Sequence, residues 1–114
     1  MSNNNNNMGL DWIALDETNE SCGYFRGKGV AHDPNIEKVG ELANAFYGEE
    51  DEKGCYFMTP EQQKQVIACI EAVLVKPKSE IKLWDDGETY EEWREFMEEG
   101  LAFLLEFERI HCWF

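Results

Sequence analysis

Basic residues are scarce in this chain of 114 residues, because ten lysines and arginines stand against 24 aspartates and glutamates and leave a net charge of −14. Direct binding to nucleic-acid backbones or to anionic lipid surfaces is therefore disfavoured, since both need clustered cations. No apolar run approaches the roughly 20 residues of a membrane-spanning helix, and no signal peptide is visible. We expect a cytoplasmic protein that contacts neither a membrane nor nucleic acid directly.

Short pairs of metal ligands are also missing. The four cysteines lie far apart, at positions 22, 55, 69 and 112, whereas zinc sites usually use close pairs such as C-x2-C. Only His111 and Cys112 are neighbours, and adjacent residues on a helix point about 100° apart. Two disulfides are arithmetically possible, but reduced structural thiols are favoured in a chain without a secretory signal. The sequence thus indicates neither a metal site nor a cofactor.

Apolar spacing predicts the α+β class, with three helices packed on a small, mainly antiparallel sheet. Residues 1–7 include five consecutive asparagines and are expected to form a disordered leader, ahead of a single α+β domain over residues 8–114. Strands are expected over residues 12–15, 22–26, 54–58 and 81–84. Helices are expected over residues 33–47, from Pro60 to a stop at residues 76–78, and from about Thr89 to the C-terminus.

Two helix starts carry clear local signals. Thr59 can cap the backbone, Pro60 suits the first helical position, and Gln62 can complete a capping box. Asp33 before Pro34 offers the same kind of start. Glycines at positions 27 and 29 interrupt the chain before that helix, and residues 49–52 predict an acidic loop.

Short motifs are spread along most of the chain after its leader. Met-Gly-Leu-Asp-Trp stands at residues 8–12, and Gly-Tyr-Phe-Arg at residues 23–26 leads toward a predicted helix. Cys55-Tyr56 precedes the second helix, and Tyr90-Glu91-Glu92-Trp93 opens the last one. Together these motifs resemble a group of small uncharacterised proteins encoded by bacteriophages and other viruses. The resemblance implies a viral origin and no assigned activity.

The last predicted helix is strongly acidic, since residues 85–108 contain ten acids and one base. Six glutamates at three- and four-residue spacing crowd one helical face: Glu88, Glu91, Glu92, Glu95, Glu98 and Glu99. A rigid carboxylate row can mimic nucleic-acid phosphates and occupy the groove of a basic protein. A solvated face that keeps an aromatic-rich protein in solution is the alternative.

The one locally basic stretch offers a different function. Arg26 and Lys28 lie among glycines, and His32 comes just before the predicted helix start, so the segment could hold a phosphate or nucleotide, with Tyr24 close in sequence. The stretch lacks the G-x-x-x-x-G-K-[ST] pattern of a phosphate loop. A surface loop whose cations pair with nearby carboxylates explains it equally well.

Catalytic constellations are not recognisable. Neither of the two histidines has a nucleophile at a suitable spacing, so we assign no catalytic residue. Residues 103–114 are apolar on several helical faces, which predicts docking on the domain or contact with a second copy of the chain. The leading hypothesis is a non-enzymatic, virus-encoded interaction protein that binds a basic partner, such as a nucleic-acid-binding protein. The alternative is a small-ligand module or an enzyme that uses the Arg26–His32 stretch.

Overall fold

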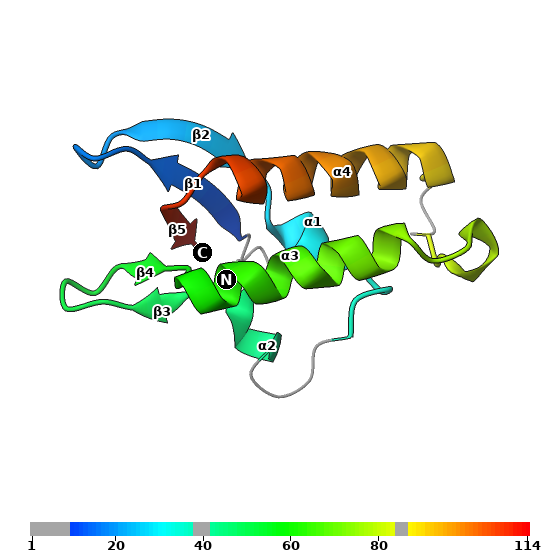
Figure 1. Cartoon of the computed structure of the whole chain (residues 1–114), viewed down its shortest axis with the longest axis horizontal. Helices are drawn as coiled ribbons and strands as arrows, with labels where there is room; N and C mark the ends of the chain where they lie inside the picture. Colours follow the sequence, from blue (N-terminus) through cyan, green and yellow to red (C-terminus); the bar gives the residue numbers. More distant parts are fainter. Residues whose placement is uncertain (1–9, 38–41, 84–86) are drawn as a thin grey trace, which may run out of the picture.

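The computed structural model describes residues 10–37, 42–83 and 87–114 (Figure 1). The expected leader over residues 1–7, the Met-Gly pair at 8–9 and residues 85–86 of the acidic stretch lie outside the described residues. In the part that is described, none of the helices combines the length and the apolar character needed to cross a bilayer.

Within the described residues, five strands form one sheet in the order β2-β1-β5-β4-β3. They are β1 (Asp11–Leu15), β2 (Ser21–Phe25), β3 (Glu49–Glu50), β4 (Tyr56–Phe57) and β5 (Ile110–Trp113). The last strand in sequence therefore lies at the centre of the sheet, between β1 and β4. All the pairings are antiparallel, which confirms the predicted α+β class.

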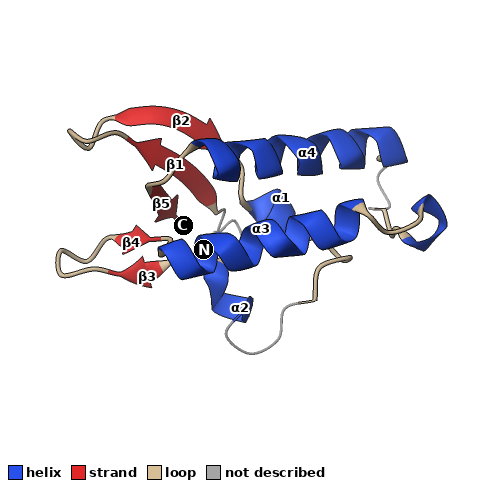
Figure 2. Ribbon diagram, in the orientation of Figure 1, coloured by secondary structure: helices blue, strands red, loops and turns tan. Residues whose placement is uncertain are grey.

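Two long helices, α3 (Pro60–Leu74) and α4 (Tyr90–Glu106), pack side by side next to the sheet (Figure 2). Three short pieces complete the described helices: α1 (Lys28–Ala31), α2 (Leu42–Ala45) and the 3-10 turn η2 (Lys78–Glu80). The predicted capping box of Thr59 and Gln62 begins α3, and Thr89 with Glu92 forms a second one at the start of α4. Each box satisfies two backbone N–H groups that a helix leaves unpaired.

The two faces of the sheet differ because strand side chains alternate in direction. Trp12 on β1 and Ile110 on β5 are fully buried on the face that carries the helices. On the same face, the ring of Phe25 lies 4.9 Å from that of Phe96 of α4. We call the opposite side the outer face. It carries the half-buried Ile13 and His111, and neither α3 nor α4 covers it.

The helix predicted over residues 33–47 is wrong for most of its described length. Residues 33–36 form a turn, and helix is present only in α2. Asp33 does not cap a helix, because its Oδ1 accepts hydrogen bonds from the backbone and side-chain amides of Asn35 at 2.8 and 2.9 Å. Its Oδ2 accepts one from Trp93 Nε1 at 2.8 Å. Burial of this carboxylate against α4 thus replaces its predicted capping role.

Two shorter elements also differ from prediction. Residues 81–83 form no strand, and the backbone N–H and C=O of Lys82 bond to the side-chain amide of Asn35 at 2.7 and 2.9 Å. The side-chain amide of Asn35 therefore makes the backbone hydrogen bonds with Lys82 that a neighbouring strand would otherwise make. Trp84 lies outside the described residues. Within the predicted acidic loop, Glu49 and Glu50 form β3, paired with β4.

The last predicted helix ends early. The side-chain amide of Gln63, on α3, donates to the carbonyls of Leu104 and Phe107 at 2.6 and 2.7 Å and satisfies the final turn of α4. The chain then reverses into β5. The sequence predicted that residues 103–114 continue the helix with apolar side chains on several faces. In the structure, residues 110–113 of this segment form β5, which pairs with both β1 and β4 at the centre of the sheet. The chain-terminal Phe114 stacks on Tyr47, with ring centroids 5.5 Å apart.

Candidate functional site

The acidic row predicted from the sequence forms a continuous surface on α4. Five of the six glutamates lie on the helix within an arc of about 120° at about 100° per residue, and all five are exposed: Glu91, Glu92, Glu95, Glu98 and Glu99. We call these five the acidic face. Glu88 lies before the helix and is half-buried. The opposite side of α4 is anchored in the core through Trp93 and Met97, among other residues.

Three members of the acidic face have local partners. Glu91 lies 3.5 Å from Lys78 Nζ, and Glu98 lies 3.2 Å from Arg94 Nε. Glu92 accepts the backbone N–H of Thr89 in the capping box. The other two, Glu95 and Glu99, form no ion pair within residues 10–37, 42–83 and 87–114. Most of the negative charge of this surface is therefore turned to solvent.

The residues of the alternative ligand site make separate contacts. The hydroxyl of Tyr24 donates to Asp11 at 2.6 Å, and this hydrogen bond raises the pKa of the tyrosine. His32 contacts the hydroxyl of Tyr47 at 3.2 Å. Arg26 is exposed and Lys28 half-buried at the first position of the single-turn α1.

The backbone around these cations is also occupied. The N–H groups of residues 27, 28 and 29 donate to the carbonyls of residues 25, 10 and 26, at 3.0, 2.8 and 3.3 Å. A Cβ at Gly27 would lie 2.4 Å from the ring of Trp12, and one at Gly29 would lie 2.4 Å from that of Phe96. These glycines allow close aromatic packing, so this segment does not provide the flexible, free N–H groups of a phosphate-binding loop.

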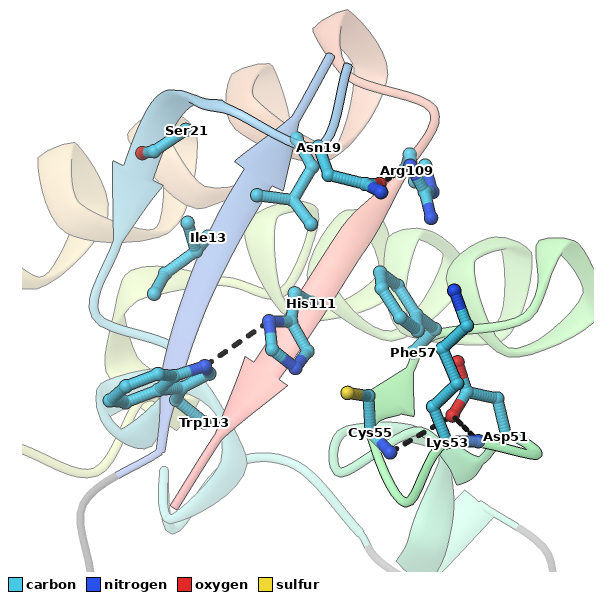
Figure 3. A pocket seen from close by; sticks show the side chains of 11 residues that line it. Ile13, Asn19, Ser21, Asp51, Lys53, Cys55, Phe57, Arg109, His111 and Trp113 are labelled. Atoms are coloured by element: carbon cyan, nitrogen blue, oxygen red, sulfur yellow. Dashed lines mark hydrogen bonds between the residues drawn. The ribbon is translucent and has the colours of Figure 1, made fainter. Parts of the chain in front are cut away.

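A pocket of about 400 Å³ lies on the outer face of the sheet (Figure 3). It is formed where β5 runs between the β1–β2 hairpin and the β3–β4 hairpin. Its lining combines apolar, aromatic and polar side chains: Ile13, Leu15, Asn19, Ser21, Asp51, Lys53, Cys55, Phe57, Arg109, His111 and Trp113. We call it the outer-face pocket.

Two cations and one carboxylate set the charge of this pocket. The guanidinium of Arg109 lies 4.9 Å from the ring centroid of Phe57 and donates a hydrogen bond to Asn19 Oδ1. Asp51 accepts the backbone N–H groups of Cys55 and Lys53, both at 2.9 Å, and these bonds hold its pKa below the usual value. Neither Arg109 nor Lys53 forms an ion pair with an acidic side chain in the described part of the chain.

His111 lies at the centre of the pocket lining (Figure 3). Its ring stacks on Phe57, with centroids 4.8 Å apart, and its Nδ1 accepts a hydrogen bond from Trp113 Nε1 at 3.1 Å. Burial lowers the pKa of His111, and the positive charge of Arg109 adds to this effect against the opposing charge of Asp51. The neutral ring with an acceptor at Nδ1 carries its proton on Nε2. His111 is thus a hydrogen-bond donor here rather than a base.

Sequence reasoning missed this pocket because it placed Arg109 and His111 on a helix. The available signal in the sequence was the order apolar, polar, apolar in Ile110-His111-Cys112, which has the two-residue period of a strand. The burial of alternate residues in β5 follows the same period. Cys112 fits this pattern, because burial raises the pKa of its thiol to about 12. Cys22, Cys55 and Cys112 are free thiols. Within the described residues, no three potential metal ligands lie close together.

Comparison with known proteins does not identify a family. No protein-family model, curated protein or solved structure matches the chain.

Proposed function

We propose that this chain is a non-enzymatic interaction protein that binds a basic partner through the acidic face of α4. The observation that carries the proposal is the alignment of five exposed glutamates on a helix whose opposite side is buried in the core. A helix held in this way presents its charges in a fixed pattern. Fixed, complementary charge speeds association and selects partners by sign.

The spacing of the charges supports a partner that normally binds nucleic acid. From Glu91 to Glu99 the helix rises about 12 Å, at about 1.5 Å per residue. Five carboxylates over this length give roughly one charge per 3 Å of helix axis, close to the rise of about 3.4 Å of duplex axis per phosphate of one DNA strand. A basic groove that follows a phosphate backbone can therefore accept this helix.

The energetics favour a partner as well. Like charges at three- and four-residue spacing destabilise a helix by about 0.2–0.5 kcal/mol per pair. Burial of Trp93 and Met97 offsets this cost in the free protein. Cations of a bound partner would remove this repulsion between the glutamates. Part of the binding free energy would therefore come from the loss of a repulsion that is present in the free protein.

The proposed setting follows the resemblance seen in the sequence. A virus-encoded protein of this kind would meet its basic partner in the cytoplasm of the host cell. Contact between two copies of the chain through residues 103–114 stays a prediction. The alternative ligand site around Arg26, Lys28 and His32 has no observation in its favour beyond the charges themselves.

Affinity capture with a charge-neutralised helix tests the proposal. The variant carries Glu91→Gln, Glu95→Gln, Glu98→Gln and Glu99→Gln, and it retains Glu92 for the capping box. The immobilised wild-type chain should retain basic proteins from lysate at about 0.1 M salt and lose them at about 1 M, where screening is nearly complete. Added DNA should release them, and the variant should retain none.

The matched control neutralises four exposed glutamates elsewhere, at positions 17, 20, 61 and 71. It has the same net charge as the variant, so it separates the pattern on α4 from overall charge. Equal retention of the captured proteins by wild type and by the α4 variant would contradict the proposal. If both variants lose the captured proteins equally, the acidic face contributes to binding only through the net charge of the protein.

A further inference from the structure

The outer-face pocket is built from three segments that lie far apart in the sequence. The β1–β2 hairpin, the β3–β4 hairpin and β5 each contribute side chains (Figure 3). Its volume of about 400 Å³ lies in the range of about 300–1,000 Å³ that is typical of small-molecule sites. The antiparallel pairing of β5 with β1 and β4 places these segments together, so folding itself assembles the pocket.

The charge of the pocket is opposite to that of the molecule. Arg109 and Lys53 outnumber Asp51, whose Oδ1 is already engaged by two backbone N–H groups. The chain as a whole carries −14. A local positive site in a strongly negative protein attracts a small anion at short range, while the overall field repels a long polyanion. The charge distribution therefore favours a compact anionic ligand over a nucleic-acid strand.

The far end of the pocket is aromatic. Trp113 is 56% exposed, and its indole is positioned by the hydrogen bond to His111. The apolar side chain of Ile13 lies beside it in the lining (Figure 3). An exposed indole next to an apolar side chain provides a stacking surface for a planar ring. Asp11 pairs in register with Trp113. Because this neighbour is acidic, the positive charge of the pocket is not concentrated at its aromatic end.

The separation of the two ends determines the size of the ligand. Arg109 and Trp113 are four residues apart along one strand direction, which corresponds to about 13 Å at roughly 3.3 Å per residue. The bond from the Leu15 N–H to the Arg109 carbonyl continues the strand pairing to that point. A ring with a directly attached carboxylate is too short to reach both ends. A base joined to a phosphate through a sugar spans them.

We propose that the outer-face pocket binds a nucleoside monophosphate. The phosphate lies between Arg109 and Lys53, where charge-assisted hydrogen bonds hold it. The base stacks on Trp113, and Nε2 of His111 donates a hydrogen bond to the sugar or the base. This site lies apart from the acidic face of α4 and does not depend on the function proposed for that face.

Calorimetric titration with four nucleoside monophosphates, the matching nucleosides and inorganic phosphate tests the proposal on the full chain. We expect at least one monophosphate to bind, with its nucleoside and inorganic phosphate each at least tenfold weaker. The reason is that each of these two fragments reaches only one end of the pocket. Equal affinity for inorganic phosphate would overturn the assignment of a nucleotide, and so would the absence of binding by all four monophosphates.

Lys53→Gln is the sharpest variant, because the ammonium group of Lys53 forms no ion pair or cation–π contact with another described residue. We expect it to weaken monophosphate binding about tenfold and to leave nucleoside binding unchanged. Trp113→Leu should weaken both, with thermal unfolding measured to show that the sheet is intact. Unchanged affinity in Lys53→Gln would overturn the proposal.

Lys28→Gln is the matched control, since it removes the same charge from the cationic stretch around Arg26 and His32. We expect this control to bind like the wild type. If Lys28→Gln loses binding and Lys53→Gln does not, the ligand binds at that stretch, and the pocket assignment is wrong. The glutamine variant of α4 should bind the nucleotide as well as wild type does, which keeps failure of this proposal distinct from failure of the partner-binding function.

Discussion

The two faces of the sheet use the same strands for different purposes. On β1 and β5, alternate residues point toward the helices or toward the outer face. Trp12 is completely buried under the helices, whereas Trp113, on the neighbouring strand, is 56% exposed on the outer face. Burial at the first face supplies stability, because apolar area is removed from water there. The second face keeps aromatic and charged groups accessible.

Charge separates the same two sides of the molecule. The solvent side of the helical layer carries the acidic face of α4, and the outer-face pocket carries Arg109 and Lys53. Opposite charges held on separate, ordered elements cannot neutralise one another by direct pairing. A small protein can in this way offer two recognition surfaces of opposite sign, provided that the buried face alone holds the fold together.

Removal of one indole from each face tests this division most strongly. Trp12→Ala should lower the free energy of unfolding by about 3–5 kcal/mol, because it empties a fully buried site and removes the hydrogen bond from Trp12 Nε1 to the Phe46 carbonyl. Trp113→Ala should cost less than about 1 kcal/mol, as expected for a largely exposed position. Urea denaturation of both variants measures the difference, and similar losses would show that the outer face also stabilises the fold.

The buried carboxylate under the helices should show the next largest effect. Asp33→Ala leaves the indole N–H of Trp93 without its acceptor and frees the turn at Asn35, so we expect a loss of about 2–3 kcal/mol. Asp16 provides a matched exposed case, because its Oδ1 accepts hydrogen bonds from Thr18 and Glu20 in a surface turn. Asp16→Ala should cost about 1 kcal/mol or less in the same denaturation assay.

The elements that the sequence predicted correctly are those specified by local interactions. The capping box at Thr59 depends on neighbours within three residues, and α3 begins where it was expected. The helix expected at Asp33 failed because a distant residue, Trp93, takes up the carboxylate. Likewise, Gln63 ends α4 from another helix. Such contacts between remote segments have no periodic signal in the chain.

The candidate sites follow the same division. The acidic face of α4 was predictable, because helical spacing alone places Glu91, Glu95 and Glu98 together. The outer-face pocket was not, since Lys53 and Arg109 line one pocket only when β5 pairs between β1 and β4. A segment with many apolar residues fits either a buried helix or a central strand, and the choice depends on the partners available across the sheet.

Close packing at a glycine on the helix-covered face gives a smaller effect. Gly27→Ala would place a Cβ 2.4 Å from the buried ring of Trp12, and we expect a loss of about 1–3 kcal/mol from overpacking. Gly54 has a φ of +78° and no atom within 4 Å of an added Cβ, so Gly54→Ala should lose only the backbone term of about 1 kcal/mol. Thermal unfolding of both variants compares the two losses of stability. If Gly27→Ala and Gly54→Ala lose equal stability, the ring of Trp12 has room to move, and the helix-covered face is less tightly packed than described.

The electrostatics of the outer face provide the finest test. Burial lowers the pKa of His111, so the folded state disfavours the protonated ring. Its contribution to stability is complete above the ordinary value of about 6.5 and is lost as the pH falls through the lowered pKa. Titration of the ring protons by NMR from about pH 4 to about pH 8 follows this group directly.

Neighbouring charges should then move the pKa of His111 in opposite directions. Arg109→Gln removes a positive charge and should raise it, whereas Asp51→Asn keeps the Oδ1 acceptor of the turn, removes a negative charge and should lower it further. Arg26→Gln, outside the pocket lining, should leave it unchanged. A shift with Arg26→Gln as large as that with Arg109→Gln would mean that His111 senses only the net charge of the protein. Dependence on Arg109 and Asp51 alone would instead show that His111 senses the local charges of the pocket, separately from the acidic helix.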